Sequence, residues 1–446
     1  MWDLDRIKKI KMQTDSISPS FCAMKWLHTT LHLHIGQTHS CYLPQSHHIP
    51  LDEIAKDPSA LHNTRHKKQA RKKMLKGERP SECSMCWAVE DTTPDAISDR
   101  LRGNAKQFAR TELEELAEMP WNVNVNPRYL EVNFGNSCNL MCGYCSPSIS
   151  TKWTEEIKKI GGYNLNNKTH YSIDYLDSES YYGPNDPNPY IDAFWKWWPS
   201  LRNSLHTLRI TGGEPLMNKH AMRMLDELRN NPQPNLNLLI NTNLCVSKNK
   251  IENFFTKLTA LQADKCVKQI ILNTSVESTG AQAEYMRTGL NFGDWENNLI
   301  RALDLGFEVM IMSTFNVLCV GSYKPLIDKI KQWRTQYSVE QLQWTNSLLQ
   351  NPDHWSPVIL TQKMHKHFDE YLNIMNDKNI LDIERQHMLQ IYNVVKKGFE
   401  EEKLQAARND FVKFFGENDK RYGTNLMTAF PEFIGELAEW SKAPAY

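Results

Sequence analysis

The sequence predicts an α/β fold in which six strands alternate with helices to form a partial barrel. Strand-like and helix-like segments alternate from about residue 127 to residue 345, and this alternation is typical of a parallel sheet with crossover helices. Polar, motif-like residues follow the strands, at the ends where barrel enzymes carry their sites. We therefore expect a partial (β/α)6 barrel of the TIM type, preceded by a cysteine module and followed by a helical extension.

Each element of the expected barrel has its own signal. Leu130, Val132 and Phe134 alternate with polar residues, as in a half-buried strand. Apolar runs bounded by turn residues predict five further strands, over residues 206–211, 236–242, 268–276, 307–315 and 340–345. Apolar residues at helical spacing predict helices over residues 221–229, 295–305 and 324–337.

The chain divides into four expected parts. A polar lead over residues 1–20 precedes a cysteine module with a connecting helix over 21–119, and the barrel covers 120–350. The barrel contains a long insertion over 148–200, rich in aromatic residues, which either covers the substrate or is a structural flap. Helical segments with a polar outer face form the C-terminal region, over 351–446.

The bulk composition argues against several classes of protein. The 446 residues include 52 Lys+Arg and 52 Asp+Glu, so the formal net charge is zero, and this balance predicts neither a nucleic-acid nor an anionic-membrane partner. The basic run over 65–79 is interpreted as the wet face of a helix. We see no bilayer-spanning apolar run and no apolar signal-peptide region, so we expect a soluble, cytoplasmic protein.

Three cysteines in one short segment carry the strongest chemical signal. Cys138, Cys142 and Cys145 have the spacing C-x3-C-x2-C, with Tyr144 directly before the last cysteine. Thiolates bind iron–sulfur clusters, normally one per iron, so three of them leave one iron of a four-iron cluster open to a ligand. The alternatives are a zinc site, whose short motifs usually come as C-x2-C pairs, or buried free cysteines.

This segment and a downstream turn, Gly212-Gly213-Glu214-Pro215, together resemble the radical S-adenosylmethionine (radical SAM) superfamily. The resemblance implies that the open iron binds S-adenosylmethionine, which one electron cleaves to a 5′-deoxyadenosyl radical that takes a hydrogen atom from the substrate. It also implies that Gly212, Gly213 and Glu214 bind the methionine amino group, because the glycines let the backbone approach a ligand closely. Alone, the turn is an ordinary one.

The same resemblance implies further contacts with the cofactor. Ser275, at the end of the fourth strand, is expected at the ribose hydroxyls, and Glu277 near it carries less weight. Arg287 is expected to hold the methionine carboxylate in its planar fork. Asn316, after the fifth strand, is expected at the nucleoside, and Tyr144 is also assigned to cofactor binding. The plain alternatives are a solvated strand end and a surface salt bridge.

A second group of cysteines lies in the N-terminal module. Cys22, Cys41, Cys83 and Cys86 supply four thiolates, enough to saturate a four-iron cluster. Their pattern resembles the twitch domain, a short relative of the SPASM domain that carries one auxiliary cluster. In the best-known proteins this module follows the barrel, whereas here it precedes it, as in a group of phage-type radical SAM proteins with a twitch domain. The alternative is a zinc site of four cysteines.

The sequence therefore predicts a radical SAM oxidoreductase or modifying enzyme. Its expected cofactors are S-adenosylmethionine, a catalytic 4Fe–4S cluster and a second, auxiliary 4Fe–4S cluster. The expected partners are an external one-electron reductant such as flavodoxin or ferredoxin, and a substrate that is a peptide or a protein. The alternative is a non-catalytic iron–sulfur or zinc protein that carries electrons or serves as a scaffold.

Overall fold

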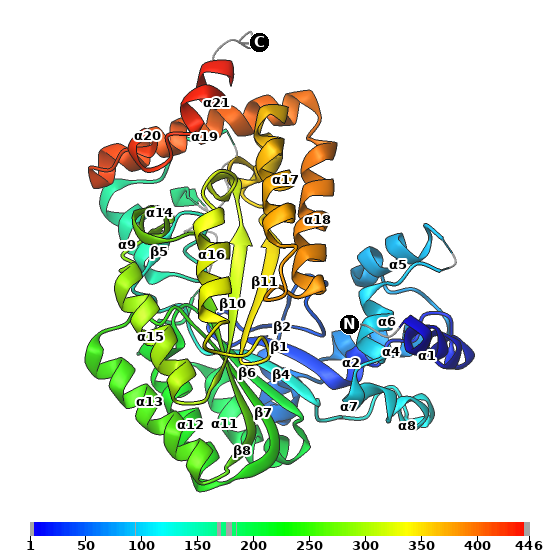
Figure 1. Ribbon diagram of the computed structural model, residues 1–446. Coiled ribbons are helices and arrows are strands. Elements are labelled where there is room, and N and C mark those ends of the chain that lie inside the picture. The colour runs from blue at the N-terminus through cyan, green and yellow to red at the C-terminus, as the bar shows by residue number, and fades with distance from the viewer. Residues whose placement is uncertain (1–3, 94, 167–170, 175–180, 184, 441–446) are drawn as a thin grey trace. The chain divides into compact units, whose positions relative to one another are not determined.

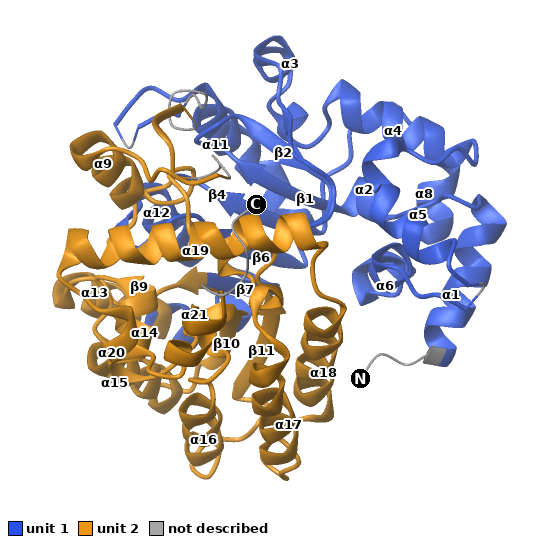
Figure 2. Ribbon diagram, turned by 90° about the horizontal axis from the view of Figure 1, so that it is seen from above, with its two compact units in different colours: residues 1–135, 181–240, 260–270 blue, residues 136–180, 241–259, 271–446 orange. Residues whose placement is uncertain are grey.

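The computed structural model divides the chain into two compact units. It describes residues 4–93, 95–166, 171–174, 181–183 and 185–440. The first unit comprises residues 1–135, 181–240 and 260–270, and the second comprises residues 136–180, 241–259 and 271–446 (Figure 2). Each unit contains parallel strands and helices, which confirms the predicted α/β class (Figure 1). The closure of the strands into a barrel stays a prediction.

The strands of the first unit form one apolar and one polar face. In sheet order they are β7 (Gln233–Thr242, of which 241–242 fall in the second unit), β6 (Thr207–Thr211), β4 (Tyr129–Asn133), β1 (His28–His32), β2 (Gln37–His39) and β3 (His47–His48). Strands β7 to β1 pair in parallel, and β2 and β3 continue antiparallel. Because side chains alternate along a strand, Leu31, Val132 and Ile210 align in one buried layer. Glu131 and Arg209 lie side by side on the opposite face.

The N-terminal part of this unit is helical, and it differs from the expectation of one connecting helix. Its helices are α1 (Leu4–Ile17), α2 (Met24–Leu27), α3 (Leu51–Lys56), α4 (Arg65–Leu75), α5 (Ser84–Glu90), α6 (Asp99–Asn104), α7 (Gln107–Arg110) and α8 (Leu113–Glu118). Lys106 has an extended backbone (ψ 144°) that separates α6 from α7. The side chain of Asn104 accepts a hydrogen bond from the Ala23 amide (2.8 Å), which fixes the end of α6 against the segment that carries Cys22.

Helix α4 is also not simply a wet face, because two of its basic side chains are fully buried. Lys67 and Arg71 have no exposed surface. The Lys67 ammonium donates to the hydroxyls of Thr29 and Thr38 (2.8 Å each) and to a backbone carbonyl. Buried charges persist only where such partners replace water. The remaining basic residues of the helix, among them Lys73, face solvent as predicted.

The insertion contributes α9 (Thr151–Ile160) to the second unit and, with its final residues, α11 (Pro189–Leu201) to the first; α12 (Lys219–Asn230) follows in the first unit. Trp197 and Trp198 of α11 are buried, and the Trp197 indole donates to the side chain of Asn126 (3.0 Å). These aromatic residues therefore belong to the packing of the first unit. Residues 167–170, 175–180 and 184 of the insertion lie outside the described residues.

The second unit contains a parallel group of strands and a small ribbon. Its parallel strands, in sheet order, are β11 (Leu342–Leu348), β10 (Glu308–Phe315) and the end of β8 (Val267–Ser275). The ribbon pairs β5 (Met141–Cys142) with β9 (Arg287–Thr288) antiparallel. All six predicted strands are thus present. The ribbon, which the sequence did not predict, sets Cys142 directly opposite Arg287.

Helices surround these strands and fill the C-terminal region. They are α13 (Lys248–Ala263, whose last residues fall in the first unit), α14 (Gly280–Met286), α15 (Phe292–Asp304), α16 (Lys324–Trp333), α17 (His365–Ile374), α18 (Asp382–Lys397), α19 (Glu401–Tyr422), α20 (Leu426–Ala429) and α21 (Phe433–Trp440). Helix α15 contacts β10, and α18 contacts β11. A fully buried ion pair joins Arg334, just after α16, to Glu384 of α18 (2.6 Å). It anchors the C-terminal helices to the strand layer.

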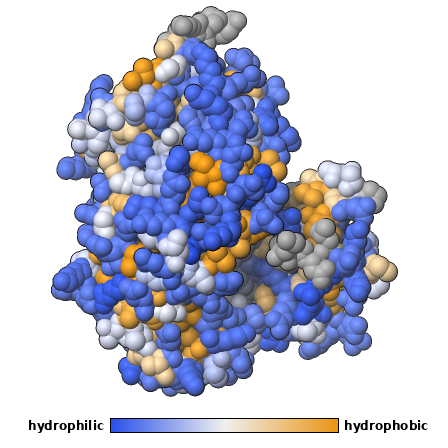
Figure 3. Space-filling view, viewed as in Figure 1, coloured by the Kyte–Doolittle hydropathy of each residue, from blue (hydrophilic) through white to orange (hydrophobic). Residues whose placement is uncertain are grey.

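Polar residues dominate the visible surface. Hydrophilic side chains cover most of the face shown in Figure 3, and the apolar ones gather in small patches between them. None of the helices in the described part of the chain combines the length and the apolar character that a bilayer span requires.

Candidate functional site

The three cysteines of the C-x3-C-x2-C segment lie together in a loop of the second unit. Cys138 and Cys142 are buried and Cys145 is half-buried. Helix α9 fixes this loop: the hydroxyl of Thr151 accepts a hydrogen bond from the Cys138 amide (3.2 Å), and the indole of Trp153 donates to the Cys142 carbonyl (2.9 Å). Helix α9 thus begins where the loop ends and holds it from one side.

The thiols of this loop are close enough to influence one another. Burial raises the pKa of the Cys145 thiol, and the neighbouring Cys142 and Cys138 raise it further. Burial also raises the pKa of Cys142, although the cation of Arg287 opposes that effect. Three thiols gathered in one buried loop are the donor set that a cluster with an open iron requires.

Arg287 is the charged centre of this site. Its Nε and Nη2 atoms donate to the two carboxylate oxygens of Glu277, both at 2.6 Å, and Nη2 also lies 2.6 Å from the Tyr144 hydroxyl. Its third nitrogen, Nη1, lies 3.3 Å from the sulfur of Cys142. Burial alone would lower the pKa of Arg287, but Glu277 and Tyr144 outweigh it and the pKa is raised. Arg287 therefore stays a cation beside the Cys142 thiol.

Glu277 completes this network, although the sequence analysis assigned it less weight than Ser275. Its carboxylate is fully buried, and it accepts hydrogen bonds from the Tyr144 hydroxyl (2.9 Å) and from the backbone amide of Thr314 (3.3 Å). The planar fork of Arg287 holds Glu277 in this structure, and its role at the methionine carboxylate stays a prediction. A carboxylate only ten residues before an arginine was the signal available in the sequence.

Aromatic residues that the sequence analysis missed pack against the cysteine loop. A Cβ atom added to Gly143 would lie 2.2 Å from the indole of Trp355, so only glycine fits beneath that ring. Tyr144 meets the same indole edge to face, with ring centroids 5.6 Å apart. The hydroxyl of Tyr171 donates to the Gly143 carbonyl (2.6 Å). These rings exclude water from the loop.

The Gly-Gly-Glu turn lies in the first unit, directly after β6. Gly212 has a φ of 141°, which favours glycine, and a Cβ there would lie 2.7 Å from the carbonyl oxygen of Gly135. The amide of Gly213 donates to that same carbonyl (3.1 Å). Glu214 is almost fully buried, and its carboxylate accepts a hydrogen bond from the Leu216 amide (3.0 Å). The turn is therefore rigid and carries a buried carboxylate.

Two further predicted residues occupy different settings in the second unit. Ser275 ends β8 and is half-buried, at the strand end where the prediction needs it. Asn316 is fully buried: its side-chain oxygen accepts from the Leu318 amide (3.0 Å), and its nitrogen donates to the Thr314 carbonyl (3.1 Å). Asn316 thus caps a 3-10 turn, and its role at a nucleoside stays a prediction.

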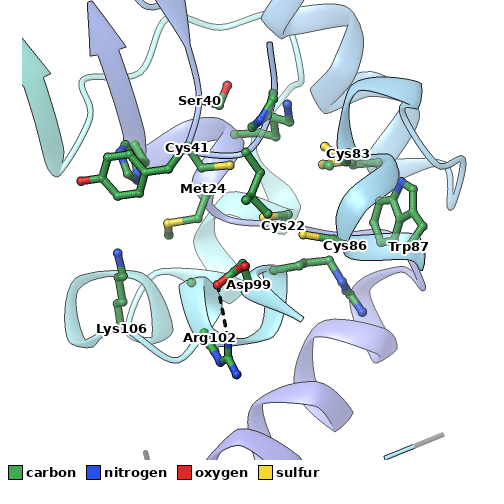
Figure 4. A pocket seen from close by; sticks show the side chains of 18 residues that line it. Cys22, Met24, Ser40, Cys41, Cys83, Cys86, Trp87, Asp99, Arg102 and Lys106 are labelled. Carbon is green, nitrogen blue, oxygen red and sulfur yellow. Dashed lines mark ion pairs between the residues drawn. The ribbon is translucent and has the colours of Figure 1, made fainter. Parts of the chain in front are cut away.

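The four N-terminal cysteines line one cavity of about 340 Å³ in the first unit. Figure 4 shows the sulfur atoms of Cys22, Cys41, Cys83 and Cys86 directed toward the same space. They come from four places in the chain: before α2, after β2, and before and within α5. Burial raises the pKa of Cys86 to about 11, and Cys41 and Cys83 contribute to that rise. The four cysteines, which are dispersed in the sequence, thus lie around one cavity.

The residues that line this cavity indicate which kind of cofactor it could bind. Among the described residues, no group of three or more Cys, His, Asp or Glu side chains is arranged as a metal-ion site, either at this cavity or at the cysteine loop. The four cysteines nevertheless line a single cavity. Four basic side chains also line the space, against one carboxylate; they are Lys25, Arg100, Arg102 and Lys106, with Asp99. The donor set and the cationic lining fit an anionic cluster.

Comparisons with known proteins add little to this geometry. No protein-family model matches the chain, and no curated protein matches it. A solved structure of native anSMEcpe with bound AdoMet and Cp18Cys peptide is similar over 56% of this chain and 61% of that one, at 14% identity and a TM-score of 0.32. The chain thus spans less than two thirds of that protein. A likeness of this size carries no argument, so function is inferred from the residues.

Proposed function

We propose that the chain is a radical SAM enzyme whose catalytic 4Fe–4S cluster is held by Cys138, Cys142 and Cys145. The observation that carries this proposal is the gathering of three thiols in one buried loop, with the Arg287 guanidinium 3.3 Å from the Cys142 sulfur. When bound, the cluster supplies the electron that cleaves S-adenosylmethionine to a 5′-deoxyadenosyl radical, which takes a hydrogen atom from the substrate.

The residues of the second unit have defined tasks in this proposal. Arg287 compensates the negative charge of the Cys142 thiolate, since a cation beside a thiolate favours the charged form. Glu277 and Tyr144 hold the guanidinium in place through hydrogen bonds of 2.6 Å, and Tyr144 also donates to Glu277 (2.9 Å). Trp355 and Tyr171 close the loop against water. Exclusion of water strengthens every electrostatic interaction inside such a site.

The assigned contacts with the sulfonium cofactor remain part of the proposal. Glu214 would accept the methionine ammonium, supported by its buried carboxylate next to a glycine turn. Ser275 would meet the ribose. Arg287 reaches the methionine carboxylate only by exchanging Glu277 for it, because a bidentate fork serves one carboxylate at a time. Binding of the cofactor is therefore expected to compete with the ion pair between Arg287 and Glu277.

The N-terminal module is proposed to hold a second, auxiliary 4Fe–4S cluster on Cys22, Cys41, Cys83 and Cys86. The shared cavity and its cationic lining support this assignment. The electron donor is proposed to be a one-electron carrier such as flavodoxin or ferredoxin, in a reducing, cytoplasmic setting. The substrate is proposed to be a peptide or protein, although buried Trp197 and Trp198 leave fewer aromatic side chains for it than the sequence predicted.

The central test is reductive cleavage of S-adenosylmethionine. The protein is reconstituted anaerobically with iron and sulfide, reduced with dithionite, and assayed for 5′-deoxyadenosine. Cys142→Ala is expected to abolish the product. The matched control is Cys266→Ala, which removes a buried thiol whose neighbours include no other cysteine. Equal rates in Cys142→Ala and the unchanged protein would refute the proposal.

Metal content separates the two forms of the N-terminal site. About seven to eight irons per chain support two clusters, whereas about four irons with one zinc support a catalytic cluster and a structural zinc site. A non-catalytic electron carrier or scaffold is the second candidate function, and the occupied fork of Arg287 favours it. That candidate predicts a reducible cluster without any 5′-deoxyadenosine.

A further inference from the structure

Lys25 is a buried cation at the edge of the four-cysteine cavity. It lies in α2, three residues after Cys22, and its side chain is only 2% exposed. It lines the cavity together with the four cysteines. Lysine is almost never buried unless a partner compensates its charge, so the position of Lys25 calls for a physical reason.

Part of the compensation comes from Glu82. The Lys25 ammonium forms an ion pair with one carboxylate oxygen of Glu82, while the other oxygen pairs with the exposed His66. Glu82 directly precedes Cys83 in the chain, so the pair sits beside a thiol. Burial alone would lower the pKa of Lys25, but Cys83, Glu82 and Cys41 outweigh it and the pKa is raised. The ammonium therefore faces thiols as well as a carboxylate.

Of the three other cations that line the cavity, Arg100 and Arg102 pair with carboxylates, whereas Lys106 is half-buried and lies over the rings of Phe108 and Tyr129. Arg100 donates to Glu90 through two nitrogens, at 2.7 and 2.9 Å, and also pairs with Asp15. Arg102 pairs with Asp99 (3.5 Å), as Figure 4 shows. Lys25 differs from these three because the carboxylate that pairs with it, Glu82, is shared with His66 and directly precedes a cysteine of the cavity.

We infer that Lys25 is the residue that sets the reduction potential of the N-terminal cluster, by adding a fixed positive charge to the lining of the cavity beside Cys83. This inference rests on the proposed auxiliary cluster. One electron from the external carrier makes a four-thiolate cluster more negative by one unit, and the oxidised carrier leaves. Because net charge tunes such potentials, Lys25 stabilises the reduced cluster over the oxidised one.

The test isolates the N-terminal cluster in the full chain. Cys138, Cys142 and Cys145 are changed to alanine together, the protein is reconstituted anaerobically, and the remaining cluster is titrated with dithionite and followed by electron paramagnetic resonance. The two proteins are compared at the midpoint potential of the triple variant that keeps Lys25. At that potential, Lys25→Met is expected to raise the ratio of oxidised to reduced cluster at least tenfold. Tenfold corresponds to about 59 mV for one electron. The matched control is Lys73→Met, which removes the same charge from the exposed side of α4.

Each outcome decides a separate question. An unchanged midpoint in Lys25→Met, or an equal shift in Lys73→Met, would overturn the inference while the cluster itself stands. Absence of any iron in the parent triple variant would instead refute the proposed auxiliary cluster. If Lys25→Met fails to retain iron, an unchanged midpoint in Lys25→Arg supports the inference because arginine keeps the positive charge; a shifted midpoint in Lys25→Arg, or loss of iron in both variants, would overturn it.

Discussion

The ion pair between Arg287 and Glu277 allows a quantitative prediction about the stability of the cysteine loop. The Glu277 carboxylate is fully buried and the Arg287 side chain is 7% exposed, with two hydrogen bonds of 2.6 Å between them. Glu277→Gln keeps the shape of the side chain but leaves the guanidinium without its counter-charge. Removing one partner of a buried pair costs about 3–5 kcal/mol, so we expect the free energy of unfolding to fall by that amount.

A double-mutant cycle separates the ion pair from simple packing. In Glu277→Gln with Arg287→Met, no buried charge remains unpaired, and replacement of a whole pair by neutral residues of similar volume is often close to neutral. The double variant is therefore expected to regain at least half of the lost stability. The coupling energy comes from urea unfolding of the four proteins under anaerobic, reducing conditions, followed by far-ultraviolet circular dichroism.

One result would refute this reasoning. If the two single variants lose less than about 1 kcal/mol each and their effects add, Arg287 and Glu277 behave as a solvated surface pair, for which such small values are typical. The hydrogen bonds from Tyr144 to Glu277 would then position the tyrosine without stabilising the loop. Arg287 would also be free to take a substrate carboxylate at no cost.

Three further predictions test the packing and charge of other elements. Gly143→Ala is expected to cost about 1–3 kcal/mol by overpacking against the indole beside it, whereas Gly416→Ala, where an added Cβ meets nothing, is expected to gain about 0.5–1 kcal/mol; thermal unfolding of both variants checks the opposite signs. Glu384→Ala leaves Arg334 buried and unpaired and is expected to cost about 3–5 kcal/mol, measured by urea unfolding. Burial, helped by nearby cations, lowers the pKa of His47 to about 3, below the unfolded value of about 6.5. The contribution of neutral His47 to the free energy of unfolding is therefore complete above about pH 6.5. It is lost as the pH falls toward 3, and the loss at pH 5 is about 1–2 kcal/mol. His47→Gln is expected to flatten the stability profile in that window.

The positions of six strands along the chain follow from the sequence because each of these strands has a local pattern. Val132 and its neighbours alternate with polar residues, and all six expected strands are present. The addition of β1 beside β4 was not predictable in the same way. It depends on register pairing between His28–His32 and Tyr129–Asn133, residues about a hundred positions apart, and no local pattern specifies which strand a distant edge accepts.

The candidate sites show the same difference between local patterns, which the sequence reveals, and long-range contacts, which it does not. The spacing of Cys138, Cys142 and Cys145 predicts a shared loop because neighbouring residues cannot separate far. The convergence of Cys22 and Cys41 with Cys83 and Cys86 on one cavity was expected only from a resemblance, because these residues are far apart in the sequence. Buried Lys67 in α4 shows the limit of charge patterns: a basic run predicts solvent exposure on average, and only the tertiary hydrogen bonds of Lys67 reverse that expectation.

The two thiol sites, each within its own unit, share one electrostatic feature: burial disfavours the ionised form of their thiols. A buried thiol resists ionisation, and burial raises the pKa of Cys142 in one site and of Cys83 in the other. In each site a cation lies near the thiol: Arg287 is 3.3 Å from the Cys142 sulfur, and Lys25 lines the same cavity as Cys83. A carboxylate pairs with each cation, Glu277 with Arg287 and Glu82 with Lys25. A cation beside a thiolate lowers the free energy of the charged form, and thiolate is the form that binds iron. The carboxylate keeps the cation in place when the thiol is protonated. Such a pair is costly to bury and is poor support for stability alone; under the proposed function, its presence at both thiol sites serves the binding of an anionic cluster.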